Sequence, residues 1–397
     1  MSVGAGVVET GRARRRPGRL ALAGLAVLVA SLSVAAGACD DPGGTGTPYV
    51  WHLPPGFPMP LVPDDNPMTV EKVALGRALF YDQRLSVNGT MACATCHEQA
   101  RAFTTDKPTP TGATGQSIPR NALTLTNVAY AYPFTWQNPL LHSLEAQALV
   151  PMFADSPVEL GLGAVIGDIL DGFRVDPVYR ALFPRAFARM YDPFTPDVVP
   201  AALASFERTL ISGQSAYDRF VYQGDGTALT TSAQAGMALF FSERFECYHC
   251  HAGITFTSAF RTAASRGLPS DFQNDGLYNL DTRGAYPASS PGLSAITGDP
   301  TDNGKFRVPT LRNIELSSPY MHDGSIPTLD AVLDHYAAGG RNIVDGPNAG
   351  DGRRNVNKSP LVRGFTLTPD ERAALLDFLR SLTDPSFVSD PSQASPW

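Results

Sequence analysis

Positive charge is scarce in this 397-residue chain. Charged residues make up only 17% of the sequence, and 31 lysines and arginines face 38 aspartates and glutamates, which gives a formal net charge of -7. Residues 1–38 hold five of the arginines and one glutamate, so the rest of the chain has a net charge of -11. Because a phosphate backbone attracts basic surfaces, we expect no nucleic-acid partner.

Long apolar runs are also scarce, since the chain has only one. The basic segment "GRARRRPGR" precedes the run "LALAGLAVLVASLSVAAGA", and this order predicts an export signal at residues 1–38, with an uncleaved anchor as the alternative. We therefore expect the protein in the periplasm or on the outer face of the cell membrane. Cys39 lies where a bacterial lipoprotein is cut and acylated, which makes it a candidate lipid anchor, although Ala36 departs from the usual leucine of that motif.

Cysteine is the third scarce residue, and its arrangement is the strongest signal in the chain. Apart from Cys39, the four cysteines form two copies of one pattern, "CATCH" at 93–97 and "CYHCH" at 247–251. They could pair as disulfides or share a zinc ion, but neither arrangement needs a histidine after the second cysteine in both copies. Covalent c-type haem does, because the thiols bond to the porphyrin and the histidine binds its iron. The predicted attachment residues are Cys93, Cys96 and His97 for haem 1, and Cys247, Cys250 and His251 for haem 2.

The two motifs divide the chain into similar halves. Each motif follows a helix-like lead, "VALGRALF" or "AQAGMALF", with two unrelated amphipathic helices as the alternative interpretation. The Gly- and Thr-containing segment "VYQGDGTALTTS" at 221–232 is typical of a linker. We predict a flexible tether at 39–60, an N-terminal domain at 61–225, a C-terminal domain at 226–385 and a tail at 386–397.

The order of motifs resembles that of the bacterial di-haem cytochrome c peroxidase and MauG superfamily. From about residue 65 to 383 the family's order is kept by "ALFYDQRLS", "CATCH", "PRNALTLTNVAY", "SPVELG", "CYHCH", "FRVPTLRNIELSSPYMHDG" and "TLDAVLDHY". The resemblance implies a mostly α-helical fold of two c-type cytochrome domains with long loops, each around one covalently bound haem. It also implies an oxidoreductase that uses hydrogen peroxide and takes electrons from a partner protein. The sequence itself also predicts helix. Thr368, Pro369 and Glu371 predict a capped helix start in "TLTPDERAALLDFLRSL".

In this family one haem is open on its distal side and binds peroxide, while the other relays electrons. The motif order implies that haem 1, on His97, is the peroxide site. In conventional peroxidases a histidine on a loop after the first motif blocks this iron until the enzyme is reduced. Residues 98–141 contain no histidine. The resemblance to MauG therefore implies that haem 1 is five-coordinate or water-bound in the resting enzyme.

The same motifs imply the catalytic residues. Glu159 matches the glutamate that moves protons during peroxide cleavage, and Gln147 matches the glutamine that hydrogen-bonds the bound oxygens, although two extra residues separate the pair. Pro151 shapes the pocket, and Trp136 matches an indole that relays electrons between the haems. Without the family, these residues are an ordinary loop carboxylate, helix amide and core aromatic.

The resemblance also implies a calcium ion between the haems. Asn121 would bind it through its side chain, and Ser317 and Pro319 through backbone carbonyls, which are the hard oxygen ligands that calcium prefers. The family often has threonine in place of Ser317, a change without consequence for a carbonyl ligand. On its own the "PRN" segment indicates a turn.

The second axial ligand of haem 2 separates the subfamilies. Conventional peroxidases place a methionine one helix after the "PYxHxG" motif, where its thioether raises the haem potential. Tyr336 occupies that position in "TLDAVLDHYAAGG", as in MauG-like and MbnH-like members. Met321 and His335 are the rival ligands. In a further alternative, Tyr336 belongs to the apolar stripe of one helix and does not bind the iron.

Three functions fit these features. The first is a MauG-like or MbnH-like oxidase that uses hydrogen peroxide to oxidise Trp or Tyr side chains of a small exported protein. The second is a conventional peroxidase fed by a small cytochrome c, and the third is a non-enzymatic electron-transfer cytochrome. The histidine-free loop and Glu159 disfavour the third, and Tyr336 favours the first over the second. The sequence does not predict the electron exit route, because Phe245 and Tyr248 lie where MauG has a surface tryptophan.

Overall fold

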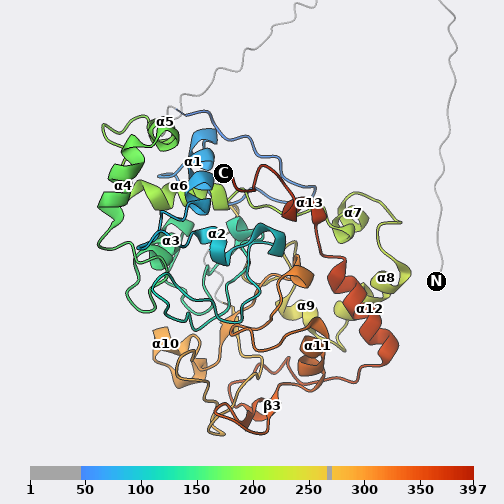
Figure 1. Ribbon diagram of the computed structural model, residues 1–397. Coiled ribbons are helices and arrows are strands. Elements are labelled where there is room, and N and C mark those ends of the chain that lie inside the picture. Colours follow the sequence, from blue (N-terminus) through green and yellow to red (C-terminus); the bar gives the residue numbers. More distant parts are fainter. Residues whose placement is uncertain (1–45, 266–270) are drawn as a thin grey trace, which may run out of the picture. The chain divides into compact units, whose positions relative to one another are not determined.

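Helices dominate the computed structural model, which describes residues 46–265 and 271–397 (Figure 1). The predicted export signal and Cys39 lie outside the described residues. Within them, sheet is confined to two antiparallel ribbons. β1 (Phe272–Gln273) pairs with β2 (Phe306–Arg307), and β3 (Asn342–Ile343) pairs with β4 (Gly350–Asp351). The predicted mostly α-helical fold with long loops is confirmed.

The helices are short and are joined by long loops, which fits the 36 glycines and 34 prolines of the chain. None of those in the described ranges has the length and apolar character that crossing a bilayer requires. In chain order they are α1 (Val70–Tyr81), α2 (Cys93–Cys96), α3 (Leu144–Phe153), α4 (Ile166–Val175), α5 (Pro177–Ala186), α6 (Val198–Glu207), α7 (Ala216–Tyr222), α8 (Thr231–Phe240), α9 (Cys247–Cys250), α10 (Ser294–Thr297), α11 (Leu329–Ala337), α12 (Pro369–Arg380) and α13 (Pro385–Val388).

Threonine side chains begin the helices that carry the two sequence leads. Thr69 accepts a hydrogen bond from the backbone N–H of Lys72 at the start of α1, and Thr230 does the same for Ala233 at the start of α8. The capping box predicted for α12 is present, with Pro369 at the first helical position. Local sequence therefore fixes where these three helices begin.

A glycine lets α1 lie directly against α6. A Cβ atom on Gly76 would be 1.9 Å from the carbonyl oxygen of Ala202 and 2.9 Å from the Cβ of Phe206. No larger residue fits this contact without movement of the α6 backbone. The crossing buries the aromatic and leucine side chains of both helices, including Leu79 and Phe80, in the largest apolar cluster.

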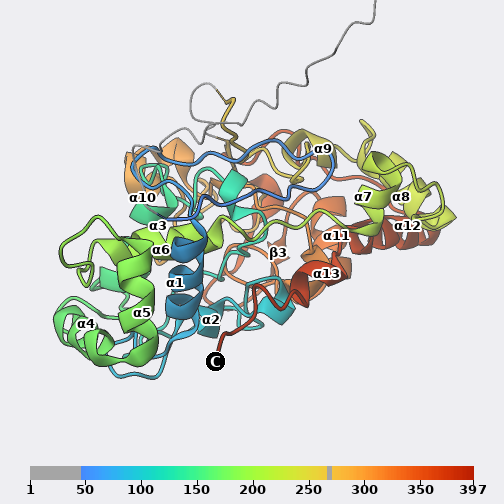
Figure 2. The same ribbon diagram turned by 90° about the horizontal axis from the view of Figure 1, so that it is seen from above.

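The same crossing recurs between α8 and α12, which lie side by side in both views (Figures 1 and 2). A Cβ on Gly236 would be 1.9 Å from the carbonyl oxygen of Ala374 and 2.9 Å from the Cβ of Phe378. Gly76 and Gly236 occupy the same position of the "GRALF" and "GMALF" leads. The repeat in the sequence thus corresponds to a repeated helix crossing beside each Cys-x-x-Cys-His motif.

Buried polar contacts join the two predicted domains. Arg312 forms a bidentate ion pair with Asp218, with both nitrogen–oxygen distances 2.8 Å and both side chains buried. The Asp384 carboxylate accepts hydrogen bonds from the backbone N–H groups of Gly213 at 3.0 Å and Gln214 at 2.9 Å. The division at residues 225 and 226 stays a prediction, and these contacts fix the two predicted halves against each other.

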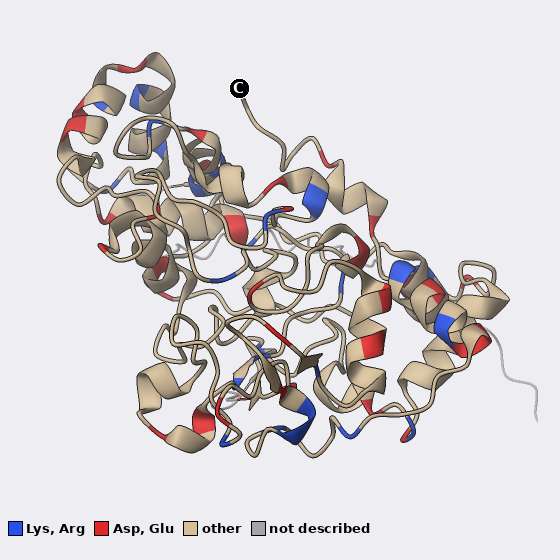
Figure 3. Cartoon of the chain, turned by 60° about the horizontal axis from the view of Figure 1, so that its bottom comes forward, with Lys and Arg blue, Asp and Glu red and all other residues tan. Residues whose placement is uncertain are grey.

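Both ends of the described chain contact the helices. From residue 46, the segment predicted as a tether is held by backbone hydrogen bonds, such as that from the N–H of Val70 in α1 to the carbonyl of Thr47 at 2.9 Å, and Phe57 is buried against Tyr130. The predicted tail is held as well, because Arg77 donates to the carbonyl of Ala394 at 2.6 Å and Tyr81 to that of Gln393 at 2.8 Å. Acidic and basic residues are scattered over many elements without separation by sign (Figure 3).

Candidate functional site

A cavity of about 1300 Å³, open solvent at its mouth included, lies beside the first Cys-x-x-Cys-His motif. One turn of helix, α2, holds Cys93 and Cys96, and His97 caps it, so all three side chains line this cavity. Most of the other lining side chains are apolar. The space and its lining have the character of a cofactor site.

A second cavity, of about 1330 Å³ with open solvent included, lies beside the second motif. Cys247, Cys250 and His251 line it from α9 and its C-cap. Much of the rest of its wall comes from α8, α11, α12 and the segment around β2. The chain therefore forms one large cavity for each motif.

The two motif histidines have equivalent hydrogen bonds. His97 Nδ1 lies 2.9 Å from the carbonyl oxygen of Phe103, and His251 Nδ1 lies 3.2 Å from that of Phe256. Burial lowers the pKa of His97, and burial lowers the pKa of His251 to about 4. A neutral imidazole that donates through Nδ1 presents Nε2 as a metal ligand, which is the state that an axial haem ligand needs.

The four motif thiols are half-buried and free. Burial raises the pKa of Cys96 and of Cys250 to about 11 and that of Cys247 to about 12, and it raises the pKa of Cys93 still further. Thiol exchange needs the thiolate, which these surroundings disfavour. The two Cys-x-x-Cys pairs line different cavities, so they do not meet around one zinc ion. The environment of the thiols therefore fits covalent attachment of a cofactor better than either alternative.

Two arginines that the sequence analysis did not single out fit the charge of a haem, which carries two propionate carboxylates. Arg307 is buried in the wall of the second cavity, and its Nε has no hydrogen-bond partner within the described ranges. Burial lowers the pKa of Arg307 to about 10. Arg120 lines the first cavity, and burial lowers its pKa too. Since a buried charge needs a counter-ion, these guanidinium groups are suited to holding the propionates.

The residues predicted for peroxide chemistry line the first cavity together. Gln147 and Pro151 face it from α3, and Glu159 faces it from the loop that follows. This loop is fixed by hydrogen bonds, including one of 2.9 Å from the backbone N–H of Leu160 to the carbonyl of Pro151. Burial raises the pKa of Glu159, and the Arg120 cation lowers it in part. A buried carboxyl group with a raised pKa is suited to accepting and returning a proton.

Glu207 is a further acid in this cavity, and the sequence analysis missed it. It ends α6, is buried, and has no hydrogen-bond partner for its Oε2 within the described ranges. Burial raises the pKa of Glu207 to about 8, so it is largely protonated at pH 7. Its only sequence signal is its place in "SFERTL", where a glutamate follows an apolar helix.

Trp136 is the one described residue that lines both cavities. Its indole nitrogen donates to the carbonyl oxygen of Asn121 at 2.8 Å, and the ring is buried. Asn121 also lines the first cavity, and its backbone N–H donates to the carbonyl of His322 in the wall of the second at 2.8 Å. The wall between the cavities is therefore a hydrogen-bonded unit with an indole at its centre.

The rival axial ligands of haem 2 lie in different surroundings. Tyr336 lines the second cavity from α11, and none of the described residues hydrogen-bonds to its phenol oxygen. Burial, and then the charges of Asp275, Cys250 and Cys247, raise the pKa of Tyr336. Met321 lines the same cavity and packs against the apolar cluster around Trp136. His335 is turned away, with its Nε2 3.0 Å from the carbonyl of Asp275, and does not line the cavity.

The predicted calcium ligands lie in ordered segments. The amide nitrogen of Asn121 donates to the carbonyls of Lys107 at 3.1 Å and Pro108 at 3.3 Å, which directs its oxygen to the other side. Ser317 ends a 3-10 turn and donates its hydroxyl hydrogen to the carbonyl of Ile314. The calcium site itself stays a prediction.

Comparison with known proteins adds an independent finding. A family described as di-haem cytochrome c peroxidase matches residues 70–227. The chain is 32% identical over 330 residues to methylamine utilization protein MauG of Methylorubrum extorquens, covering 83% of each chain. It is 34% identical over 395 residues to cytochrome-c peroxidase IdrP1 of a Pseudomonas species, covering 93% of this chain and 94% of that one.

A solved structure is similar over nearly the same length. It is a MauG-like protein associated with microbial copper homeostasis, which matches with a TM-score of 0.86 and 46% identity over 88% of this chain and 99% of that chain. The family implies two haem c groups, which the two cavities fit in size, in donor set and in the arginines that line them. The chain therefore belongs to the di-haem cytochrome c peroxidase family and is an oxidoreductase of that family.

Proposed function

We propose that the protein is a hydrogen peroxide-dependent oxidase that takes electrons from Trp or Tyr side chains of a small exported partner protein. The observation that carries this proposal is Tyr336, whose phenol faces the second cavity without a hydrogen-bond partner among the described residues. A phenolate is a hard, anionic ligand that stabilises oxidised iron, whereas a thioether stabilises reduced iron. Tyrosine ligation suits an enzyme that holds oxidising equivalents rather than one that stores an electron.

Three residues of the first cavity would act on hydrogen peroxide. With haem held at His97, Glu159 would move a proton from one oxygen of hydrogen peroxide to the departing oxygen, a role that its place in the cavity wall and its raised pKa both favour. Gln147 would hydrogen-bond the peroxide oxygens from α3, and Pro151 would shape the wall beside them. His97 is the only histidine in the cavity wall within the described ranges, so no second imidazole competes with peroxide there.

On the electron side, Trp136 connects the two cavities. When bound, the two haems supply the redox chemistry, with His97 holding one iron and His251 with Tyr336 holding the other. The indole lies in the wall that both cavities share and is held at the Asn121 carbonyl. This position allows electrons to pass from the second site to the first without a mobile carrier.

The stoichiometry fits side-chain oxidation. Reduction of one hydrogen peroxide to two waters consumes two electrons and two protons. A Trp or Tyr side chain that undergoes two-electron oxidation releases two electrons and two protons, so no other reductant is needed. The relatives at 32% and 46% identity are a MauG and a MauG-like protein, which supports this role over a purely detoxifying one.

A conventional peroxidase is the second candidate, and Met321 favours it. This methionine lines the second cavity, as Tyr336 does, so its thioether is within the same wall. With Met321 as the ligand, haem 2 would store an electron from a small cytochrome c. The relative named cytochrome-c peroxidase IdrP1, at 34% identity, is consistent with this alternative.

The proposal includes the setting of the enzyme. An export signal at residues 1–38 would deliver it to the periplasm or the outer face of the membrane, with a lipid anchor on Cys39 as the means of attachment. Calcium held by Asn121, Ser317 and Pro319 would stabilise the segments between the haems. Two cytochrome domains, 61–225 and 226–385, would each enclose one haem.

The test uses the oxidised holoenzyme with one equivalent of hydrogen peroxide and two alternative donors, supplied separately. These are a reduced small cytochrome c and the exported-protein fraction of the native cell. We expect peptide mass spectrometry to find peroxide-dependent oxidation at Trp or Tyr in one exported protein, with a Tyr336→Phe enzyme producing none. Rapid turnover of the cytochrome without any side-chain oxidation would overturn the proposal in favour of the conventional peroxidase.

A further inference from the structure

We propose that Glu243, Glu246 and His249 form a binding site for a divalent transition-metal ion of the Zn²⁺ or Cu²⁺ class at the rim of the second cavity. Within the described ranges, these residues are the one group of three or more His, Cys, Asp or Glu side chains that is arranged to hold a metal. The site is separate from the haem ligands and from the predicted calcium ligands. It does not depend on the proposed function.

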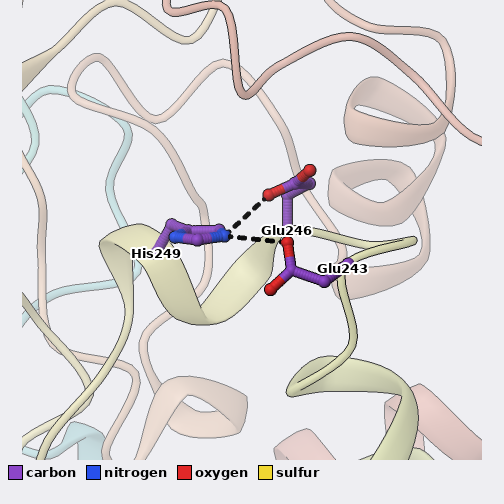
Figure 4. Close-up of side chains that lie close together, drawn as sticks. All are labelled: Glu243, Glu246 and His249. Carbon is purple, nitrogen blue, oxygen red and sulfur yellow. Dashed lines mark hydrogen bonds and ion pairs between the residues drawn. The ribbon is translucent and has the colours of Figure 1, made fainter.

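One oxygen of each glutamate faces Nε2 of His249 (Figure 4). His249 Nε2 lies 2.8 Å from an oxygen of Glu246 and 3.5 Å from an oxygen of Glu243. All three atoms lie within 4.8 Å of one another. A metal ion with ligand distances of about 2.0–2.2 Å fits between atoms at this separation after only small side-chain movements.

An outer partner orients each carboxylate. The other oxygen of Glu243 accepts the hydroxyl hydrogen of Tyr248, and the other oxygen of Glu246 pairs with Arg363. Arg363 also donates to the backbone carbonyl of Glu243 at 3.2 Å. The remaining oxygens are thereby turned toward His249. Metal sites commonly have such outer hydrogen bonds, which fix the orientation of the ligands.

The backbone places the ligands at different depths. Glu246 caps α9 and is buried, with only 8% of its side chain exposed, while His249 lies one helical turn later and is 33% exposed. Glu243, in the preceding turn, is 77% exposed. An ion can therefore enter from solvent on the Glu243 side and keep water as its further ligands. That open side leaves a three-residue donor set with free coordination positions.

Charge and donor type select the class of ion. Two carboxylates outnumber the single guanidinium of Arg363, so the group attracts a cation. One imidazole and two carboxylates suit Zn²⁺ and Cu²⁺, which bind such mixed sites more tightly than the earlier divalent metals do. Calcium prefers six or more oxygen ligands, which this group does not offer. Without a metal, the same atoms form direct contacts between His249 and its two glutamates.

The site lies beside haem 2. Glu246 lines the second cavity, and His249 stands between the two haem-attaching residues Cys247 and Cys250. A bound divalent charge at this rim favours the less positive, reduced state of a neighbouring iron. Occupation of the site should therefore raise the reduction potential of haem 2.

Zinc is the probe, because it is redox-silent and leaves the haem spectra readable. Calorimetric titration of Zn²⁺ into calcium-loaded holoenzyme should show one bound zinc ion per protein. The Kd for zinc should rise at least about tenfold in Glu243→Gln and in His249→Gln, and about tenfold in Tyr248→Phe. The matched controls Glu315→Gln and His52→Gln, which lie elsewhere in the chain, should bind zinc as the parent enzyme does. Glu243→Gln lies outside the haem motif, so its haem content should stay complete.

A redox titration of haem 2 gives a second readout. Zinc should raise the potential of the parent enzyme and leave that of Glu243→Gln unchanged. Two results would overturn the proposal. One is a parent enzyme that binds no zinc, in which case the three residues are an ion pair only. The other is zinc binding that Glu243→Gln and His249→Gln leave unaltered, which would locate the ion elsewhere.

Discussion

Trp136 donates its indole N–H to the backbone carbonyl of Asn121 at 2.8 Å in the wall between the two cavities. This bond fixes the plane of the only described side chain that faces both sites. Asn121 in turn donates to the carbonyl of His322. A change in the indole therefore affects both the proposed electron transfer between the haems and the hydrogen-bonded wall that holds the ring.

Trp136→Phe should slow electron transfer between the haems far more than it slows peroxide binding. Phenylalanine keeps an aromatic ring but is harder to oxidise and cannot donate to Asn121. Rapid-mixing absorbance spectroscopy with one equivalent of peroxide should show a normal change at haem 1 and a delayed or missing change at haem 2.

The control for this substitution is Trp51→Phe, since Trp51 lines neither cavity. It should leave both spectral changes at the parent rate. Equal rates in the Trp136 and Trp51 variants would remove the indole from the electron path.

Glu159→Gln should leave both haems attached and slow peroxide consumption on the order of 100-fold, the usual scale for losing a general acid-base group. Glutamine has a similar shape but cannot accept the proton. Stopped-flow measurement of peroxide loss gives the rate, and Glu98→Gln is the control, because Glu98 follows His97 without lining the cavity. A parent-like rate in Glu159→Gln would assign the proton transfer to another group.

The pH profile provides a second test of Glu159. Burial raises its pKa above the ordinary carboxyl range, and the base must be ionised, so the rate should fall as pH drops through that raised pKa. Arg120 holds the pKa down in part. In Arg120→Gln the acidic limb of the profile should therefore move to higher pH, while in Glu159→Gln it should be lost. An acidic limb that survives in Glu159→Gln belongs to a different acid.

Short-range patterns carried most of what the sequence could predict. The Cys-x-x-Cys-His motifs fixed six residues of the two cavities, and Thr368 and Glu371 fixed the start of α12. Cavity residues from distant segments were harder to find. Arg307 and Glu207 resemble ordinary polar residues in sequence, and only packing shows that each is buried beside a cavity without full hydrogen bonding.

The tail illustrates the same limit. A Ser- and Pro-containing end predicts loose structure, yet it docks on α1 through bonds from Arg77 and Tyr81 to its backbone carbonyls. Backbone acceptors are present in every sequence, so no pattern of side chains signals this contact.

Gly76→Ala and Gly236→Ala should each destabilise the protein by about 1–3 kcal/mol, the usual range for overpacking. In each case the new methyl group would lie 1.9 Å from a backbone carbonyl oxygen, of Ala202 or of Ala374, so the helices must separate. Denaturant unfolding of the holoenzyme, followed by circular dichroism, measures the loss.

Gly172→Ala is the matched control, because a Cβ at this exposed position of α4 meets no atom within 4 Å. It should stabilise the protein by about 0.5–1 kcal/mol through helix propensity. If Gly76→Ala and Gly236→Ala behave like Gly172→Ala, the two crossings are not as close as described.

Tyr336→Phe should change the absorption and electron paramagnetic resonance signals of haem 2, because phenylalanine offers no oxygen to the iron. Met321→Leu should leave these signals unaltered, since its role would be packing near Trp136. The reverse pattern would make methionine the axial ligand and the conventional peroxidase the better account.

The most direct test is electron paramagnetic resonance of the fully oxidised, resting holoenzyme, before and after one equivalent of hydrogen peroxide and with no reductant added. The first cavity has no histidine in its described wall apart from His97, so haem 1 should give a high-spin signal and haem 2 a low-spin signal. Peroxide should remove the high-spin signal at once. Two low-spin signals that ignore peroxide until the enzyme is partly reduced would contradict the account.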